Sequence, residues 1–229
     1  LVEAVAVGSE RTKGFDQPEP SLDNPRGFFE SRQLMELNEA LLESIGSNWN
    51  TPPLLPVNWP NEGRLELFNK QRSKFEDYAL NSLWVDKDPR LCVTYPAFLH
   101  ILLKRVPLIC VIRDPLEVAL SLYARNAIPM ERGLGIWFVY NMHLASNIQK
   151  GDVLTVYESL LDCTLDNFSD SVFNEIDIIL DTLGNEVPSK NKWGRIIRKN
   201  VDTNLRRSTS PLTFKPPQAL IDKDLLFCC

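Results

Sequence analysis

The sequence predicts an α/β fold, in which helices cover a central parallel β-sheet. Short apolar runs rich in β-branched residues alternate with longer segments whose apolar residues recur at helical spacing. That alternation is typical of βαβ units, whose strands run parallel. The chain has 229 residues, 44% of them hydrophobic, and can bury one core, so we expect a single domain over residues 1–229.

The N-terminal part of the chain predicts two helices separated by a loop. Leu1–Val7 is apolar and predicts the end of a helix, and the polar segment up to Asn24 predicts a loop. Asp23–Ser31 (DNPRGFFES) predicts a turn anchored by two phenylalanines. The second helix has four apolar residues at helical spacing, and Gly46 suits its end: Leu34, Leu37, Leu41 and Ile45.

Residues 31–80 form a predicted helical region on the substrate side of the domain. Within it, Asn48–Pro60 contains four prolines and two tryptophans, so we expect a rigid, irregular connection that is suited to line a pocket. Arg64–Leu80 predicts a charged helix, and its inward face is predicted to hold Leu65, Phe68, Phe75 and Ala79.

Three segments predict the strands of the sheet: Ser82–Val85, Val106–Ile112 and Asp152–Val156. A helix over roughly Pro96–Lys104 joins the first two, which predicts a βαβ unit with a parallel pair and a right-handed crossover. Further helices are predicted over Met130–Gln149, Asn167–Leu183 and Trp193–Val201, and residues 205–229 predict an irregular tail.

The corner after the strand Val106–Ile112 carries clear signals for the start of a helix. Asp114 is a good N-cap, Pro115 suits the first helical position, and Glu117 stands as in a capping box. One face of this helix is predicted to be apolar, with Leu116, Ala119, Leu120 and Tyr123, and another to hold Glu117, Ser121 and Arg125.

Composition narrows the classes of function. A formal net charge of −5 argues against a nucleic-acid-binding surface, although a local cationic patch for an anionic cofactor is compatible with it. The five cysteines match no zinc-site spacing, so no metal is expected; Cys92 and Cys110 lie in apolar runs that predict buried thiols, which fits a reducing, cytoplasmic compartment. The most apolar window, Ala97–Ile112, is interrupted by Lys104, Arg105 and Pro107, so no membrane span is predicted.

Arg113 and Ser121 are candidates for binding a phosphate group. Arg113 stands at the carboxyl end of a predicted strand, and Ser121 follows two turns along the next helix. Open α/β sheets bind ligands in the crevice at the carboxyl ends of their strands. A guanidinium beside a hydroxyl supplies charge and several donors to phosphate oxygens. On spacing alone, an equally good interpretation is that Arg113 pairs with Asp114 and that Ser121 faces water.

The segment RDPLEVALSLYAR, which contains these residues, resembles the 3′-phosphate-binding element of sulfotransferases that use 3′-phosphoadenylyl sulfate (PAPS). The resemblance extends from Leu1 to about Leu205, and it implies a P-loop-NTPase-like three-layer fold with a central parallel sheet. It implies that Arg113 and Ser121 hold the 3′-phosphate of PAPS. It also implies transfer of a sulfuryl group to a hydroxyl acceptor, a carbohydrate or another metabolite. VLTVYESLL resembles a strand end of the same family, where the residue matching Glu158 is structural.

Lys87 is the strongest candidate for a catalytic cation. Its segment, KDPR, resembles the Lys-Asp/Ser-Pro element of tyrosylprotein and glycosaminoglycan sulfotransferases, in which the lysine lies beside the transferred group. A cation at that place stabilises the charge on the oxygens of the transferred group. Arg90 is predicted to contact the cofactor or an acidic acceptor. The alternative is a solvated charge cluster, in which Lys87 lies beside two aspartates and Arg90 pairs with Asp86 or Asp88.

Glu30 is the candidate general base. Sulfuryl transfer to a hydroxyl needs a group that takes the acceptor proton, and GFFE resembles the GYFE turn of bacterial PAPS sulfotransferases. The alternative is that Glu30 caps the helix that begins near Ser31. The two histidines are rivals for the role of base, but His100 lies in an apolar helix that predicts a core position, and His143 lies on a mixed helix.

One motif of the sulfotransferase family is absent from the sequence. The family has a PxSGTx turn that holds the 5′-phosphosulfate, and neither this run nor GxxxxGK[ST] is found here. The order of motifs in the family places this loop just upstream of Leu1, so we expect the chain to lack the first strand and the phosphosulfate loop. Two alternatives therefore stay open: a non-catalytic domain of sulfotransferase type, and a nucleotide kinase on the same fold, which requires a GK[ST] loop and a carboxylate for Mg²⁺.

Overall fold

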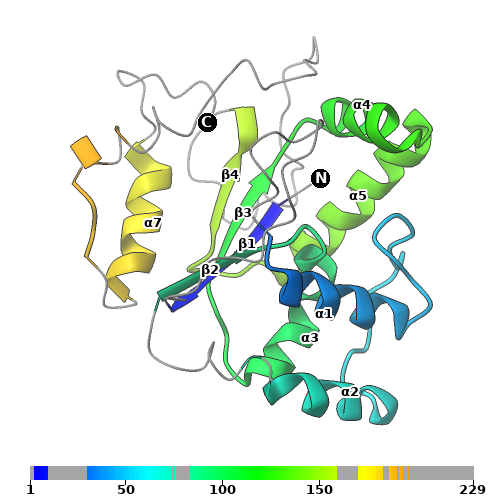
Figure 1. Ribbon diagram of the computed structural model, residues 1–229. Coiled ribbons are helices and arrows are strands. Elements are labelled where there is room, and N and C mark those ends of the chain that lie inside the picture. Colours follow the sequence, from blue (N-terminus) through cyan, green and yellow to red (C-terminus); the bar gives the residue numbers. More distant parts are fainter. Residues whose placement is uncertain are drawn as a thin grey trace.

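The computed structural model describes residues 3–9, 30–73, 75, 83–158, 170–182, 186–189, 191–192 and 195, and over these the protein is of the α/β class. Its sheet has the strand order β2-β1-β3-β4, with β1 at Glu3–Ser9, β2 at Leu83–Lys87, β3 at Leu108–Ile112 and β4 at Val153–Val156. β3 and β4 are parallel, as expected. Figure 1 shows helix α7, residues Asp170–Thr182, on one side of the sheet and helices α1 to α5 on the other.

The N-terminal segment corrects two expectations. A helix was expected over Leu1–Val7, but Glu3–Ser9 forms strand β1, which is antiparallel to both of its neighbours. Val5 pairs with Lys87 of β2 on one side and with Ile109 of β3 on the other. Hydrogen bonds on both edges satisfy the backbone of the segment, and long-range pairing of this kind overrides local helical propensity. Because β1 lies between them, β2 and β3 run in the same direction but are not the neighbouring pair that was predicted.

Helix α1, Arg32–Glu43, follows the prediction closely. The Ser31 hydroxyl accepts a hydrogen bond from the backbone N–H of Leu34 at 3.3 Å, and Gly46 takes a φ of +69° just past the helix end. Its predicted inward leucines are fully buried: Leu34, Leu37 and Leu41. The side-chain cap and the left-handed glycine satisfy the backbone groups at the two helix ends. The residues at which this helix begins and ends therefore follow from the local sequence.

Helix α2, Glu62–Arg72, is shorter than the predicted helix over Arg64–Leu80. Phe68 and Phe75 are buried as expected, but Leu65 is 46% exposed, so its predicted inward position is wrong. Ala79 lies outside the described residues. Most residues of α2 are polar or charged, so the helix has no continuous apolar stripe to bury. It packs against α3.

Helix α3, Leu91–Leu102, begins earlier than the predicted start at Pro96 and keeps that proline in its interior. A proline has no N–H, so the carbonyl of Cys92, one turn before it, loses its helical partner. The side-chain amide of Asn147 donates to that carbonyl at 2.8 Å, from the last residue of helix α5, Met130–Asn147. The tertiary contact replaces the missing helical hydrogen bond, and a helix starting at Leu91 becomes possible.

Helix α4, Pro115–Asn126, starts as predicted, because the Asp114 carboxylate accepts from the N–H groups of Leu116 and Glu117 at 2.8 and 3.0 Å. The predicted apolar face is wrong in part. Leu120 and Tyr123 are 40% and 58% exposed, whereas the helix buries the side chains of Glu117, Val118, Ala119 and Leu122. The buried face is turned toward α5, the helix that α4 packs against most extensively.

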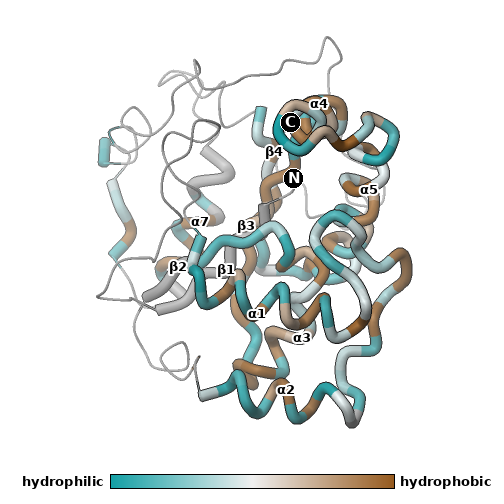
Figure 2. Tube along the Cα trace, turned by 45° about the vertical axis from the view of Figure 1, so that its right-hand side comes forward, coloured by the Kyte–Doolittle hydropathy of each residue, from teal (hydrophilic) through white to brown (hydrophobic). Residues whose placement is uncertain are grey.

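The core lies between the sheet and the helices that pack on it. Figure 2 shows hydrophobic segments interrupted by hydrophilic ones along α1, α3, α4 and α5, as expected for helices that bury one face. Cys92 and Cys110 are free thiols buried in this core, as predicted. Among the described residues, no helix has the length and apolar character needed to cross a membrane. The predicted tail, 205–229, and the helix Trp193–Val201, apart from residue 195, lie outside the described residues.

Candidate functional site

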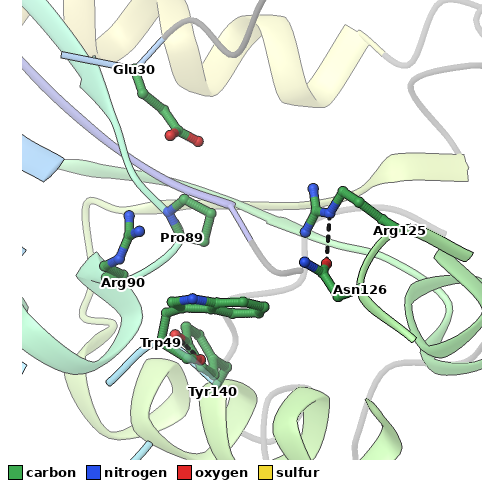
Figure 3. Close-up of a pocket in the computed structure, with 7 residues that line it drawn as sticks. All are labelled: Glu30, Trp49, Pro89, Arg90, Arg125, Asn126 and Tyr140. Carbon is green, nitrogen blue, oxygen red and sulfur yellow. Dashed lines mark hydrogen bonds between the residues drawn. The ribbon is translucent and has the colours of Figure 1, made fainter. Parts of the chain in front are cut away.

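A pocket of about 260 Å³ lies where the turn after β2, the Trp49 segment, α5 and the end of α4 meet. It is lined by Glu30, Trp49, Pro89, Arg90, Arg125, Asn126 and Tyr140. Figure 3 shows these side chains around one open space, with Glu30 across from the Trp49 indole and with Arg90 and Arg125 on opposite sides. The lining combines two guanidinium groups, a carboxylate and an aromatic wall, so this pocket is the candidate functional site.

Glu30, one of the two residues predicted for catalysis, lines this pocket, and Lys87, the other, binds Glu30. The ammonium of Lys87, at the end of β2, donates to the Glu30 carboxylate at 2.8 Å, although 57 residues separate them in the sequence. Their side chains are only 14% and 12% exposed. Burial raises the pKa of Glu30 above its ordinary value of 4.5, while the charge and the hydrogen bond of Lys87 act in the opposite direction. Glu30 does not cap α1; Ser31 has that role.

Arg90, the third predicted residue, also lines the pocket, but carboxylates compensate its charge. Its guanidinium contacts both oxygens of Asp88 at 3.1 Å and the Glu39 carboxylate of α1 at 3.0 Å. Asp88 is fully buried and also accepts from the Arg90 backbone N–H at 2.8 Å. The alternative pairing of Arg90 with Asp88 is thus present in the structure. This network fixes the turn between β2 and α3 and therefore the position of Lys87 at its start.

Trp49 and Tyr140 form the aromatic wall of the pocket. The Tyr140 hydroxyl donates to the Trp49 carbonyl at 2.8 Å, and Tyr140 is 1% exposed. Burial raises the pKa of Tyr140 well above its ordinary range, so this hydroxyl stays a donor. Trp49 belongs to the proline-rich connection that was predicted to line a pocket. The contribution of Tyr140 was not predicted, because nothing in its local sequence separates it from the other apolar residues of α5.

Arg125 reaches the pocket from the last turn of α4. Its Nε donates to the side-chain oxygen of Asn126 at 2.9 Å. In the part of the chain that the structure describes, no carboxylate pairs with Arg125, in contrast to Arg90, Lys87 and Arg113. Arg125 was not predicted as a site residue, although its position four residues after Ser121 was a usable signal, since residues at that spacing share a helix face.

Arg113 and Ser121, the predicted phosphate ligands, do not line this pocket. The Arg113 guanidinium donates twice to the buried Glu117 carboxylate, at 2.8 and 3.1 Å, and lies 4.7 Å from the centre of the Tyr157 ring. Ser121 is exposed on α4. The corner is tied to α5, because the Trp137 indole N–H donates to the Arg113 carbonyl at 2.9 Å. The alternative pairing of Arg113 with Asp114 is replaced by the pairing with Glu117.

Glu158, after β4, is structural as expected: its carboxylate accepts from the backbone N–H of Asp114 at 3.2 Å, joining the strand end to the start of α4.

The two histidines lie away from the pocket. The expected core position of His100 is wrong, because its side chain is exposed and stacks on Phe68 with ring centres 5.9 Å apart. His143 is buried and its Nε2 lies 2.7 Å from the Pro53 carbonyl. Neither histidine lines the pocket. No cluster of three or more His, Cys, Asp or Glu side chains suited to a metal ion occurs among the described residues.

Comparisons with protein-family models, with curated proteins and with solved structures found no match to this chain. The functional argument therefore depends on the residues themselves.

Proposed function

We propose that this protein is a sulfotransferase that moves a sulfuryl group from PAPS to a small hydroxyl acceptor bound in the pocket. The observation that carries the proposal is the buried Glu30–Lys87 ion pair at the pocket wall, 2.8 Å from nitrogen to oxygen. A carboxylate and an ammonium side by side are the two groups that the reaction needs: a general base for the acceptor proton and a cation that stabilises the charge on the transferred group. We also propose a P-loop-NTPase-like origin for the sheet, on the ground that β2, β3 and β4 run in the same direction; β1, which is antiparallel to both of its neighbours, departs from the expected central parallel sheet.

The proposed step forms one bond and breaks another. The acceptor oxygen attacks the sulfur of PAPS, the bond from that sulfur to the bridging oxygen breaks, and 3′-phosphoadenosine 5′-phosphate leaves with the bonding electrons. Glu30 receives the acceptor proton, and burial favours this because it raises the pKa of the carboxyl. Lys87 then turns from the neutralised Glu30 to the sulfuryl and bridging oxygens, whose charge it stabilises.

Arg113 and Ser121 are proposed to hold the 3′-phosphate at the corner between β3 and α4. The face of α4 that carries Ser121 also carries Arg125 one turn later, and Arg125 lines the pocket. A nucleotide bound at the corner therefore extends along α4 toward the pocket. The indole N–H of Trp137 donates to the Arg113 carbonyl, so the corner lies beside α5, the helix that also carries Tyr140 of the pocket wall.

The test is calorimetric titration of the protein with 3′-phosphoadenosine 5′-phosphate. We expect binding that weakens about tenfold or more in Ser121→Ala, as for loss of a hydrogen bond to a charged group. Ser121 is exposed, so this substitution leaves the fold intact, and Ser146→Ala on α5 is a matched control because Ser146 is also an exposed helical serine. Arg113→Ala is less informative, because it removes the ion-pair partner of the buried Glu117 carboxylate and so destabilises the fold.

Absence of nucleotide binding, or equal binding by the wild type and Ser121→Ala, would contradict the proposed cofactor site. A non-catalytic domain is the second candidate. It is favoured by the absence of a PxSGTx run from the sequence and by the carboxylate partners of Arg90 and Arg113. A protein that fails to bind the nucleotide and to transfer label from sulfur-labelled PAPS to any of a panel of phenols, sugars and alcohols belongs to this second class.

A further inference from the structure

We propose that the pocket is an acceptor subsite for small aromatic hydroxy acids, with Trp49 binding the ring and Arg125 the carboxylate. This inference rests on the proposed function for its chemistry, but the subsite itself is argued from the pocket alone. Three features carry it: an aromatic wall held rigidly in place, one guanidinium without a carboxylate partner among the described residues, and a buried carboxylate on the facing wall.

The Trp49 wall is preorganised by contacts with α5. The Tyr140 hydroxyl holds the Trp49 carbonyl, and the next residue, Asn50, lies within 3.4 Å of the Arg132 guanidinium. Farther along the same connection, the Pro53 carbonyl lies 2.7 Å from His143. A half-buried indole on a fixed backbone gives a flat apolar surface that a ligand covers without an ordering cost in the protein.

The charge partners of the three cations at or beside the pocket indicate which of them binds the ligand carboxylate. Carboxylates balance the charges of Arg90 and Lys87, so a ligand anion at either cation competes with an existing ion pair. Arg125 contacts only the neutral amide oxygen of Asn126 among the described residues. A planar guanidinium in this state suits a carboxylate, which accepts two parallel hydrogen bonds from it.

Figure 3 shows the positions of the three groups around the pocket. The Trp49 indole lies over Tyr140 on one wall, Glu30 projects from the other, and Arg125 stands to one side. A ring stacked on Trp49 holds its substituents in a plane parallel to the indole, so it can present a carboxylate to Arg125 at the side of the pocket, and Glu30 faces the ring from across the pocket. The volume, about 260 Å³, lies below the range of roughly 300–1,000 Å³ found for sites of drug-sized ligands, so a single ring is the expected size.

The test compares two ligands that share the ring and the phenolic hydroxyl and differ in the group at the end of the side chain, with no nucleotide present. 4-Hydroxyphenylacetate has the ring, the hydroxyl and the carboxylate; 2-(4-hydroxyphenyl)ethanol replaces the carboxylate with a neutral alcohol. Calorimetry is expected to show that the wild type binds the acid about tenfold more tightly than the alcohol, the usual effect of a charge-assisted hydrogen bond. Arg125→Gln should abolish that preference, whereas Arg195→Gln, at an exposed arginine outside the pocket, should keep it. Trp49→Leu should weaken both ligands.

The inference is overturned if the wild type binds neither ligand, if it binds both equally, or if the preference persists in Arg125→Gln. Its failure is distinct from failure of the proposed function. Nucleotide binding that depends on Ser121, without binding of the acid, leaves a sulfotransferase with another acceptor. Binding of the acid that depends on Arg125, without nucleotide binding, leaves an aromatic-acid site on a protein that is not a sulfotransferase.

Discussion

The ion pair between Lys87 and Glu30 controls the protonation of the pocket. Burial raises the pKa of Glu30, and Lys87 holds part of that rise back through its charge and its hydrogen bond. We predict that Lys87→Met raises the pKa of Glu30 further above its ordinary 4.5, because the substitution removes the cation and leaves the carboxyl buried. Carbon-13 NMR titration of the glutamate carboxyls measures this directly, and the acid limb of the pH profile of kcat/KM should move in the same direction.

The same shift has a definite sign for stability. Because the pKa of Glu30 is raised in the folded state, that state binds the proton more readily than the unfolded chain does, and the contribution of Glu30 to the free energy of unfolding falls as the pH rises through the interval above 4.5. Lys87→Met should widen this interval toward higher pH. Lys150→Met, at an exposed lysine, is the control. An unchanged or lowered pKa of Glu30 in Lys87→Met would refute the assignment of Lys87 as its main charge partner.

At the scale of the helices, the close approach of α4 and α5 depends on Gly133. A Cβ atom at this position would lie 3.0 Å from the backbone Cα of Ala119 and 3.1 Å from its Cβ. We predict that Gly133→Ala destabilises the protein by about 1–3 kcal/mol, because the contact is with backbone and the helices must separate. The displacement also moves Arg125 on α4, so the preference for 4-hydroxyphenylacetate should decrease.

Gly135 provides the matched control two residues away. It is exposed on the same helix, and an added Cβ meets nothing within 4 Å, so Gly135→Ala should stabilise the protein by about 1 kcal/mol through helix propensity. Urea unfolding of both variants measures the difference. Equal effects of the two substitutions would mean that the α4–α5 contact is loose enough to accept a methyl group.

The starts of α1 and α4 could be predicted from the sequence, whereas the start of α3, the buried faces of helices and the partners of strands could not. Asp114 caps the helix that it was predicted to cap, since a cap is a contact over three residues, whereas the cap of α1 is Ser31 and not Glu30, the candidate considered from the sequence. The face of α4 was mispredicted at Leu120 and Tyr123, because which side meets α5 depends on the tertiary arrangement. Strand β1 was missed because its hydrogen bonds join it to strands far along the chain.

The candidate site, too, could be predicted from the sequence only in part. Glu30, Lys87 and Arg90 were chosen from short motifs, and all three lie at or beside one pocket. Trp49 was anticipated only as part of a segment, and Arg125 was quoted in a motif without a role. Both residues line a pocket that is formed by five separate segments of the chain, and the local sequence does not show which segments meet in space.

On the scale of the whole molecule, the two ends of the sheet have different tasks. The carboxyl ends of β2 and β3 carry Lys87 and Arg113, the proposed functional groups. The amino ends of β3 and β4 are joined by Asp152, whose buried carboxylate accepts from the N–H of Leu108 at 3.0 Å, from the N–H of Gln149 at 2.8 Å and from the Arg105 guanidinium. This arrangement places a hydrogen-bonding network at one end of the sheet and the proposed functional groups at the other.

We therefore predict that Asp152→Ala lowers the free energy of unfolding by about 3–5 kcal/mol, because it leaves an arginine and two backbone donors without their acceptor. Ligand binding should be unchanged at a temperature where circular dichroism shows the variant to be folded. Glu30→Gln is expected to do the reverse, altering acceptor turnover with a smaller effect on unfolding. Asp181→Ala, at an exposed aspartate of α7, should change stability by less than about 0.5 kcal/mol. If folded Asp152→Ala loses affinity for 4-hydroxyphenylacetate or for the nucleotide, the two ends of the sheet are coupled and the division of tasks is wrong.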